Sequence, residues 1–273
     1  MRTRKHAWIF VAVLACAVTA GVGSRRVPCG PDSGTTLESA VVSSITTPAT
    51  LKIATFNIHG GRGADDLRDL DRTADCLRAF DLVGLNEVHG ACLGRNENQA
   101  AQLGGMLECD WLFAPTEQRW WHYHFGNGLL SRLPVDHWQR IPLRREHGKS
   151  FRNLILTQVE LQGRIVRVLV THIDRSGDRE RAEQLRTAGQ LFLSLAEPAV
   201  LMGDMNSPPA DPHIQHLLNT TGVRDPVADA LGDEAPPRID WIFTRGLRTV
   251  DAGLIDTGAS DHPCVWAELV LAN

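Results

Sequence analysis

The sequence predicts an α/β sandwich and argues against a regularly alternating parallel sheet. Short apolar runs rich in β-branched residues alternate with longer stretches of helical periodicity. Two runs, Leu154–Leu161 and Ile165–His172, are joined through Gln162-Gly163, which is typical of an antiparallel hairpin. Antiparallel neighbours mixed with helices favour stacked layers of sheet and helix. The predicted strands are Leu51–Asn57, Leu82–Glu87, Gly128–Ser131, Leu154–Leu161, Ile165–His172, Ala199–Gly203, Ile239–Thr244 and Cys264–Leu271.

Two segments between the strands are predicted to form amphipathic helices. From Ala64 to Phe80 and from Asp178 to Leu195, apolar side chains recur every three or four residues and fall on one helical face. The chain contains no internal repeat, and its 273 residues are enough for one well-filled core.

The first 20 residues have the features of a signal peptide. Met1–His6 is basic, Ala7–Ala20 is almost wholly apolar, and Val18-Thr19-Ala20 offers a small-residue cleavage site before Gly21. The sequence therefore predicts an exported protein that is periplasmic, secreted or tethered to a membrane through its N-terminus. An uncleaved anchor, a buried N-terminal helix and lipid attachment at Cys16 are the alternatives.

The rest of the chain divides into a linker and one domain. Residues 21–50 are predicted to be the linker, because Ser24–Thr50 is rich in Ser, Thr, Pro and Gly and has little apolar periodicity. Residues 51–273 are predicted to fold as a single domain, since the first predicted strand begins at Leu51 and the last ends at Leu271.

Composition limits the partners and the kinds of metal site. The formal net charge is −4, and without Met1–Ala20 25 basic residues face 32 acidic ones, which gives −7. Such a chain has no overall positive field, so local charge or a bound cation must attract any phosphate. The six cysteines include no CxxC pair, which argues against structural zinc. In an oxidising compartment we expect one or two disulfides, whose pairing the spacing does not assign.

Polar residues that can bind metals or transfer protons lie at or near the ends of six predicted strands. A single acid at a strand end is usually a turn residue, but six such strand ends are harder to explain as turns. Strand ends converge on one edge of a sandwich, so these side chains can share a cleft. Oxygen ligands suit a hard cation such as Mg²⁺, and neighbouring histidines suit proton transfer. The residues are Asn57, Glu87, His172, Asp174, Asp204, Asn206, Asp240, Asp261 and His262.

Seven motifs containing these residues occur in one order across most of the chain. They are Thr55–His59, Val83–Val88, Gly126–Pro134, Thr171–Asp174, Gly203–Asn206, Arg238–Phe243 and Ser260–His262. Together they resemble the endonuclease/exonuclease/phosphatase superfamily, which includes DNase I, exonuclease III, neutral sphingomyelinases and inositol-polyphosphate 5-phosphatases. The resemblance implies a DNase I-like, four-layer α/β sandwich, with two packed mixed β-sheets flanked by helices. It also implies that residues 51–273 are a catalytic domain.

The resemblance implies a metal site for Mg²⁺ or Mn²⁺. Glu87 resembles the principal metal-binding carboxylate, with Asn57 beside it and Asp261 near the ion. Asn86 is a departure, because many relatives carry Gln at that position. The shorter amide can alter contacts around the metal but should not abolish metal binding.

The resemblance also implies a set of catalytic residues. Asp204 would orient the attacking water or handle protonation of the leaving group. His262 would act at the phosphate, either as a general base or by stabilising charge, with Asp240 holding its ring. Asn206 and His172 would bind the phosphate.

Three basic or aromatic features are less specific. Arg132 is predicted to add a guanidinium to the phosphate-binding site. The aromatic run Trp120–Phe125 is either a substrate-facing wall or a packed loop. Arg144–Lys149 with Arg152 either steers phosphate or forms a solvated loop.

The predicted function is therefore that of an exported, metal-dependent phosphoesterase of the phosphodiesterase or nuclease type. Its substrate would be nucleic acid, a phospholipid headgroup or a small phosphate ester, hydrolysed by in-line attack of water. A lipid or inositol-phosphate phosphoesterase of the same fold is the alternative. A non-catalytic binding module is disfavoured, because Glu87, Asp204 and His262 are all present. We infer no obligate protein partner and expect a monomer.

Overall fold

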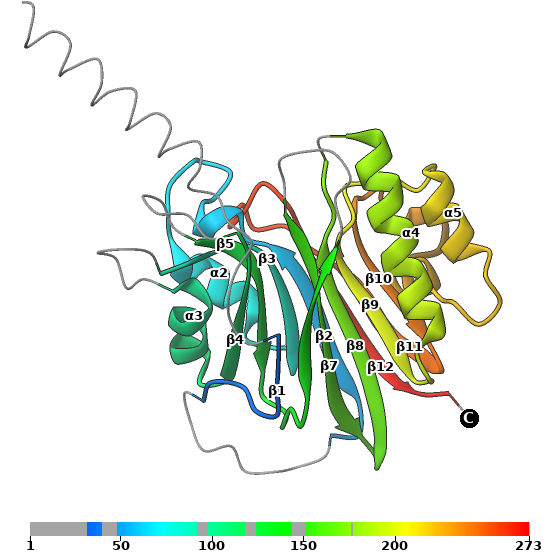
Figure 1. The fold of residues 1–273 in the computed structure, drawn as a ribbon, viewed down its shortest axis with the longest axis horizontal. Coiled ribbons are helices and arrows are strands. Elements are labelled where there is room, and N and C mark those ends of the chain that lie inside the picture. The colour runs from blue at the N-terminus through cyan, green and yellow to red at the C-terminus, as the bar shows by residue number, and fades with distance from the viewer. Residues whose placement is uncertain are drawn as a thin grey trace, which may run out of the picture.

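Two six-stranded mixed sheets pack face to face, with helices on both outer sides (Figure 1). The computed structural model describes residues 32–39, 48–91, 98–117, 124–143, 151–175 and 177–272. Helices α2 (Leu70–Leu77) and α3 (Gln99–Leu107) cover one sheet, while α4 (Asp178–Ser194) and α5 (Pro212–Leu218) cover the other. This arrangement confirms the predicted four-layer sandwich.

The first sheet has the order β1-β6-β7-β8-β9-β10, and only β8 and β9 are parallel. Its strands β7 and β8 form the predicted hairpin. The bounds are β1 Ser33–Gly34, β6 Trp138–Leu143, β7 Arg152–Leu161, β8 Arg164–His172, β9 Ala199–Asp204 and β10 Asp240–Arg245.

The second sheet has the order β11-β12-β2-β3-β5-β4, and only β2 and β3 are parallel. Strands β4 and β11 of this sheet were not among the predicted strands, nor were β1 and β6 of the first sheet. The bounds are β2 Leu51–Asn57, β3 Leu82–Gly90, β4 Asp110–Glu117, β5 His124–Ser131, β11 Leu247–Ile255 and β12 Cys264–Leu271.

The helix predicted over Ala64–Phe80 is shorter than expected. Its N-cap is Asp69, whose side chain accepts hydrogen bonds from the backbone of Asp71 and Arg72, so α2 begins only at Leu70. The predicted helix over Asp178–Leu195 is α4 with nearly the same bounds. Not predicted were α3, α5, α6 (Pro226–Leu231) and the short helices η1 (His59–Gly61) and η2 (Gly232–Glu234).

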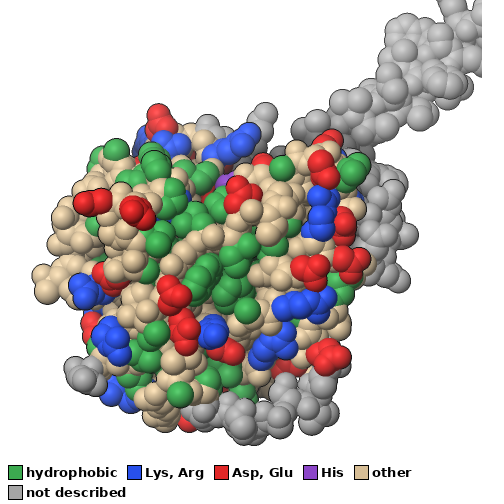
Figure 2. Space-filling view, turned by 180° about the vertical axis from the view of Figure 1, so that it is seen from behind, with side chains coloured by type: hydrophobic (Ala, Val, Ile, Leu, Met, Phe, Trp, Pro, Cys, Tyr) green, Lys and Arg blue, Asp and Glu red, His purple; other side chains and the backbone are tan. Residues whose placement is uncertain are grey.

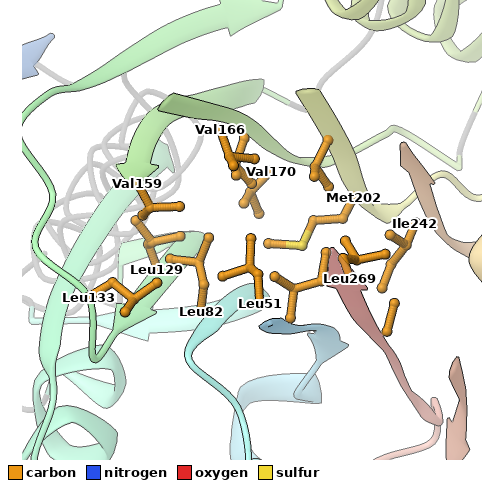
Figure 3. Close-up of a cluster of buried hydrophobic side chains, with 14 of the residues drawn as sticks. Leu51, Leu82, Leu129, Leu133, Val159, Val166, Val170, Met202, Ile242 and Leu269 are labelled. Atoms are coloured by element: carbon orange, nitrogen blue, oxygen red, sulfur yellow. The ribbon is translucent and has the colours of Figure 1, made fainter. Parts of the chain in front are cut away.

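The main core lies between the two sheets, where side chains from both point toward each other (Figure 3). Leu51, Leu82 and Leu129 come from one sheet, and Val170 and Met202 come from the other. A second apolar layer lies under α2 and α3, and a third lies under α4 and α5.

Strand alternation makes this inner space apolar at one end and polar at the other. In β9, Val200 and Met202 belong to the inner core, and Asp204 is the next residue on that face. In β2, Leu51 and Ile53 are followed in the same way by Thr55 and Asn57. The sheets therefore carry their polar inward-facing residues to one shared end.

Part of the predicted linker belongs to the folded domain. Ser33–Gly34 pairs with β6, and Glu38 forms a bridge with Trp111 on β4. Trp138 packs against Gly34 and donates from Nε1 to the carbonyl of Thr36 at 2.9 Å. Residues 32–39 thus contact a strand of each sheet.

Several predictions concern residues outside the described part of the chain. They are the signal peptide Met1–Ala20 with Cys16, the run Trp120–Tyr123 and the basic segment 144–149. Cys29 and Cys92 also lie outside it, whereas Cys76, Cys109 and Cys264 are buried free thiols. Within the described ranges no helix is long and apolar enough to cross a membrane.

Acidic and basic side chains are interspersed on the face shown in Figure 2. A group of hydrophobic side chains lies among them near the middle of that face. This mixed distribution gives this face no broad positive field, in agreement with the acidic composition.

Replacing Gly203 with Ala should destabilise the domain. Gly203 has φ 144°, and a Cβ there would lie 1.8 Å from the carbonyl oxygen of Thr171 on the paired strand β8. We expect Gly203→Ala to lower the free energy of unfolding by roughly 2–5 kcal/mol. Gly105→Ala is the matched control, because no atom lies within 4 Å of its added Cβ. Alanine should stabilise α3 by about 1 kcal/mol. Equal urea midpoints for the two variants would contradict this.

Candidate active site

A histidine–carboxylate pair lies at the polar end of the sheets. Asp240 begins β10 directly opposite Asp204 on β9. Nδ1 of His262 lies 2.7 Å from Oδ2 of Asp240, and its Nε2 lies 4.0 Å from Oδ2 of Asp204. The loop that carries His262 is anchored by Ser260, whose Oγ donates to the carbonyl of Asn57 at 2.7 Å. The structure therefore brings His262, Asp240 and Asp204 together, as the resemblance implied.

The carboxylate of Asp204 receives contacts from both sheets. Asn57 Nδ2 donates to its Oδ2 at 3.0 Å, and His172 Nε2 lies 3.4 Å from the same oxygen. The backbone N–H of Asn206 donates to Oδ1 at 2.9 Å. The backbone N–H of Asp204 in turn donates to Oδ1 of Asn86 on β3 at 2.9 Å. Asp204 is thus held at the junction between the sheets.

A bulge in β3 turns Glu87 toward this junction. The strand register shifts between Leu85 and Val88, and Glu87 has φ 57°, which is uncommon for a residue other than glycine. As a result, consecutive residues both reach the site: Asn86 contacts Asp204, and Glu87 Oε1 lies 3.3 Å from Nδ2 of Asn57. Without the extra residue, strict alternation would point Glu87 to the opposite face.

Asp261, the third predicted metal residue, lies beside the loop after β2. Its Oδ1 is 3.4 Å from Nδ1 of His59, and the backbone N–H of His59 donates to Oδ1 of Asn57 at 3.1 Å. Glu87 and Asp261 therefore both contact the segment Asn57–His59. Asp261 is exposed, whereas Asn57 is buried.

Arg152 supplies a cation at the site. The sequence left open whether this residue steers phosphate or belongs to a solvated loop. It begins β7 and lies with Cζ 6.0 Å from the ring centroid of Phe125. Burial lowers the pKa of the Arg152 guanidinium, and the nearby charges of Asp174 and Glu87 oppose that shift. One feature of the sequence indicated this position. Arg152 directly precedes the buried run that begins at Asn153. A charged residue at the end of a strand lies at the same edge of the sheet as the ends of the neighbouring strands.

Two other predicted phosphate-binding residues have different surroundings. Asn206 is half-buried, and its Nδ2 donates to the carbonyl of Ile173 at 2.8 Å, so its amide is already tied to the strand ends. Arg132 is not brought to the site. It follows β5 at the opposite end from Asn127, and its Nε donates to the carbonyl of Phe80 at 3.3 Å. The position of Arg132 does not support its predicted role at the phosphate.

The histidines and the central carboxylate have contrasting electrostatics. Burial alone would lower the pKa of His262, but the hydrogen bond and charge of Asp240, with Asp204 adding to them, raise it to about 9. Burial and the charge of Asp240 raise the pKa of Asp204 to about 7. Burial, reinforced by the charge of Arg152, holds the pKa of His172 well below its usual range. At neutral pH His262 is therefore cationic and His172 is neutral.

The side chains at this end of the sheets fit a divalent cation. Their donor atoms are carboxylate and amide oxygens, which hard cations such as Mg²⁺ prefer. Asp204, Asp240 and His262 offer ligand atoms within 4.8 Å of one another. Oδ1 of Asp240 is buried without a hydrogen-bond partner among the described residues. A buried, unpaired carboxylate oxygen is costly unless a cation or donor meets it.

The family model of the Endonuclease/Exonuclease/phosphatase family matches residues 54–262. The chain belongs to this family. The matched region contains every residue of the site, from Asn57 to His262. The protein is therefore a hydrolase of phosphoric ester bonds, as predicted. No curated protein sequence matches the chain.

Solved structures agree with this assignment. An endonuclease/exonuclease/phosphatase from Beutenbergia cavernae is 25% identical, with a TM-score of 0.67 over 83% of this chain and 72% of that one. A humanised TDP2 from D. rerio is 23% identical, with a TM-score of 0.60 over 81% and 99%. The human Nocturnin catalytic domain, solved with a sulfate anion, is 17% identical, with a TM-score of 0.63 over 84% and 96%. The latter two likenesses show the fold.

The two site histidines should titrate on opposite sides of the usual histidine pKa in metal-free protein. We expect His262 to stay protonated until about pH 9 and His172 to stay neutral well below the usual histidine pKa of about 6.5. Asp240→Asn should lower the pKa of His262, because it removes the charge that stabilises the imidazolium. ¹⁵N NMR of the ring nitrogens measures both pKa values. A His262 that titrates near 6.5 in the unaltered protein would refute the electrostatic description.

Proposed function

We propose that this protein is a divalent-metal-dependent phosphodiesterase of the nuclease type. The observation that carries the proposal is the junction of Asp204, His262 and Asp240 with Glu87 and Asn57. This arrangement offers a carboxylate able to take a proton, an imidazolium able to stabilise negative charge and oxygen ligands for a cation.

The pKa values support a division of labour between Asp204 and His262. A pKa of about 9 keeps His262 protonated at neutral pH, so it is poorly suited to act as a general base. Its Nε2–H is instead suited to donate to a non-bridging phosphate oxygen as charge develops there. Asp204, with a pKa of about 7, is suited to take the proton of the attacking water.

Glu87 and Asn57 would hold the cation, with Asp261 beside the loop after β2. When bound, the cation supplies Lewis-acid stabilisation of the phosphate charge. We assign Oδ2 of Asp240 to the histidine, because it lies 2.7 Å from Nδ1 of His262, while Oδ1 stays available to a cation. Mg²⁺ or Mn²⁺ would match these oxygen ligands.

A cavity beside His262 offers space for part of the substrate. It has a volume of about 340 Å³ and is lined by the site residues Asp240 and Asp261 and by Pro208, Pro237 and Pro263. Such a space can receive a substituent of the phosphorus beyond the reacting atoms. A D. rerio TDP2 with the same fold has been solved with a single-strand DNA product. This supports a nucleic-acid strand as the substrate class.

A substrate panel tests this function. Single-stranded and plasmid DNA, RNA, sphingomyelin, inositol phosphates and aryl phosphates would be assayed with Mg²⁺, Mn²⁺ or EDTA. We expect nucleic-acid diesters to be hydrolysed fastest and EDTA to abolish turnover. Glu87→Gln should lower kcat by roughly 10²–10³-fold, since it weakens stabilisation of the transition state.

Glu268→Gln is the matched control. Glu268 lies on β12 and forms an ion pair with Lys52 on β2, away from the site. Its turnover should equal that of the unaltered protein. Full turnover in EDTA would refute the metal dependence, and exclusive hydrolysis of sphingomyelin or of monoesters would refute the nuclease-type function.

A further inference from the structure

Three buried asparagines connect the active site to a distant edge of the fold. Asn86, Asn127 and Asn153 lie on β3, β5 and β7, and each is at most 2% exposed. Asn86 and Asn127 come from one sheet, and Asn153 comes from the other. They occupy the inner space where the apolar core gives way to the polar end.

Their amides form one continuous chain of hydrogen bonds. Oδ1 of Asn86 accepts from the backbone N–H of Asp204 at 2.9 Å, and its Nδ2 donates to Oδ1 of Asn127 at 2.9 Å. Nδ2 of Asn127 then donates to Oδ1 of Asn153 at 2.9 Å. Nδ2 of Asn153 ends the chain at the carbonyl of Pro115 on β4, at 3.0 Å.

The chain has a single direction, because every amide is fully engaged. Each Nδ2 also makes a second contact, to the carbonyls of Thr171, Asn153 and Ala114 in turn. A flip of one amide would place an oxygen against an oxygen and leave a buried donor unsatisfied, at a cost of about 1–3 kcal/mol. The orientation of Asn86 toward Asp204 is therefore fixed by Asn127 and Asn153.

We propose that Asn127 and Asn153 are positioning residues for the catalytic carboxylate. They are buried and act through Asn86, which holds the backbone of Asp204 where β9 ends. The backbone of Asp204 in turn sets where its carboxylate meets His172 and Asn57. This inference rests on the proposed function, because the positioning matters only if Asp204 acts in hydrolysis.

Asn127→Ala tests the proposal by two independent measurements. Because the middle link is lost, we expect kcat on the best substrate to fall by roughly 10–100-fold with KM unchanged. We also expect amide hydrogen exchange at Asp204 to accelerate, relative to Met202 on the same strand. Asn153→Ser removes the next link with a smaller change in volume, and it should give the same two effects if Asn127→Ala does not fold.

Ser131→Ala is the matched control. Ser131 is also buried on β5, and its Oγ donates to the carbonyl of Leu133 at 2.7 Å, outside the asparagine chain. It should lose stability and leave kcat and exchange at Asp204 unchanged. An active protein whose folded Asn127→Ala variant keeps its kcat would overturn the positioning role, whatever its exchange rates.

Failure of the proposed function gives a different result. If the unaltered protein hydrolyses no ester of the panel, both the proposed function and the positioning role are refuted. In an active protein, unchanged exchange at Asp204 in Asn127→Ala overturns the inference and leaves the proposed function standing.

Discussion

The site depends on one constraint, which is that the carboxylate of Asp204 is buried at the junction of two sheets. Asn57 and Asn86 reach Asp204 from one sheet, while His172 and Asp240 belong to its own sheet. A slide of one sheet over the other by a single residue would break these contacts. The apolar core between the sheets therefore does more than stabilise the fold, because its packing sets the alignment on which the site depends.

Burying so many polar groups is tolerated because most are paired. The backbone and amide groups around Asp204 have partners in a continuous network, and an unpaired one would cost about 1–3 kcal/mol. Oδ1 of Asp240 and Nδ1 of His172 are among the atoms that are buried without a hydrogen-bond partner in the described part of the chain. A site that binds a cation and an anionic substrate has a reason to keep such atoms available.

Sequence patterns predicted the central strands well, because buried strands are apolar runs whose polar ends are easily seen. Leu51–Asn57 and Cys264–Leu271 have the predicted bounds. Residues 32–39 were missed because contacts with Trp111 and Trp138, which are far away in sequence, hold this segment in place. The early start given to α2 ignored Asp69, which caps the helix.

The site residues divide in the same way. Glu87, Asp204 and His262 were predicted from motifs, and the structure brings them to one junction. Arg132 was expected there, yet it lies five residues beyond Asn127, roughly 17 Å along β5. Arg152 has no motif of its own, and only the folded structure shows that it lies near the charges of Asp174 and Glu87. The most direct test is the turnover of Asp204→Asn, which keeps the shape of the side chain and removes its charge. The account predicts a folded protein whose kcat falls by at least about 10²-fold, and near-normal turnover would contradict it.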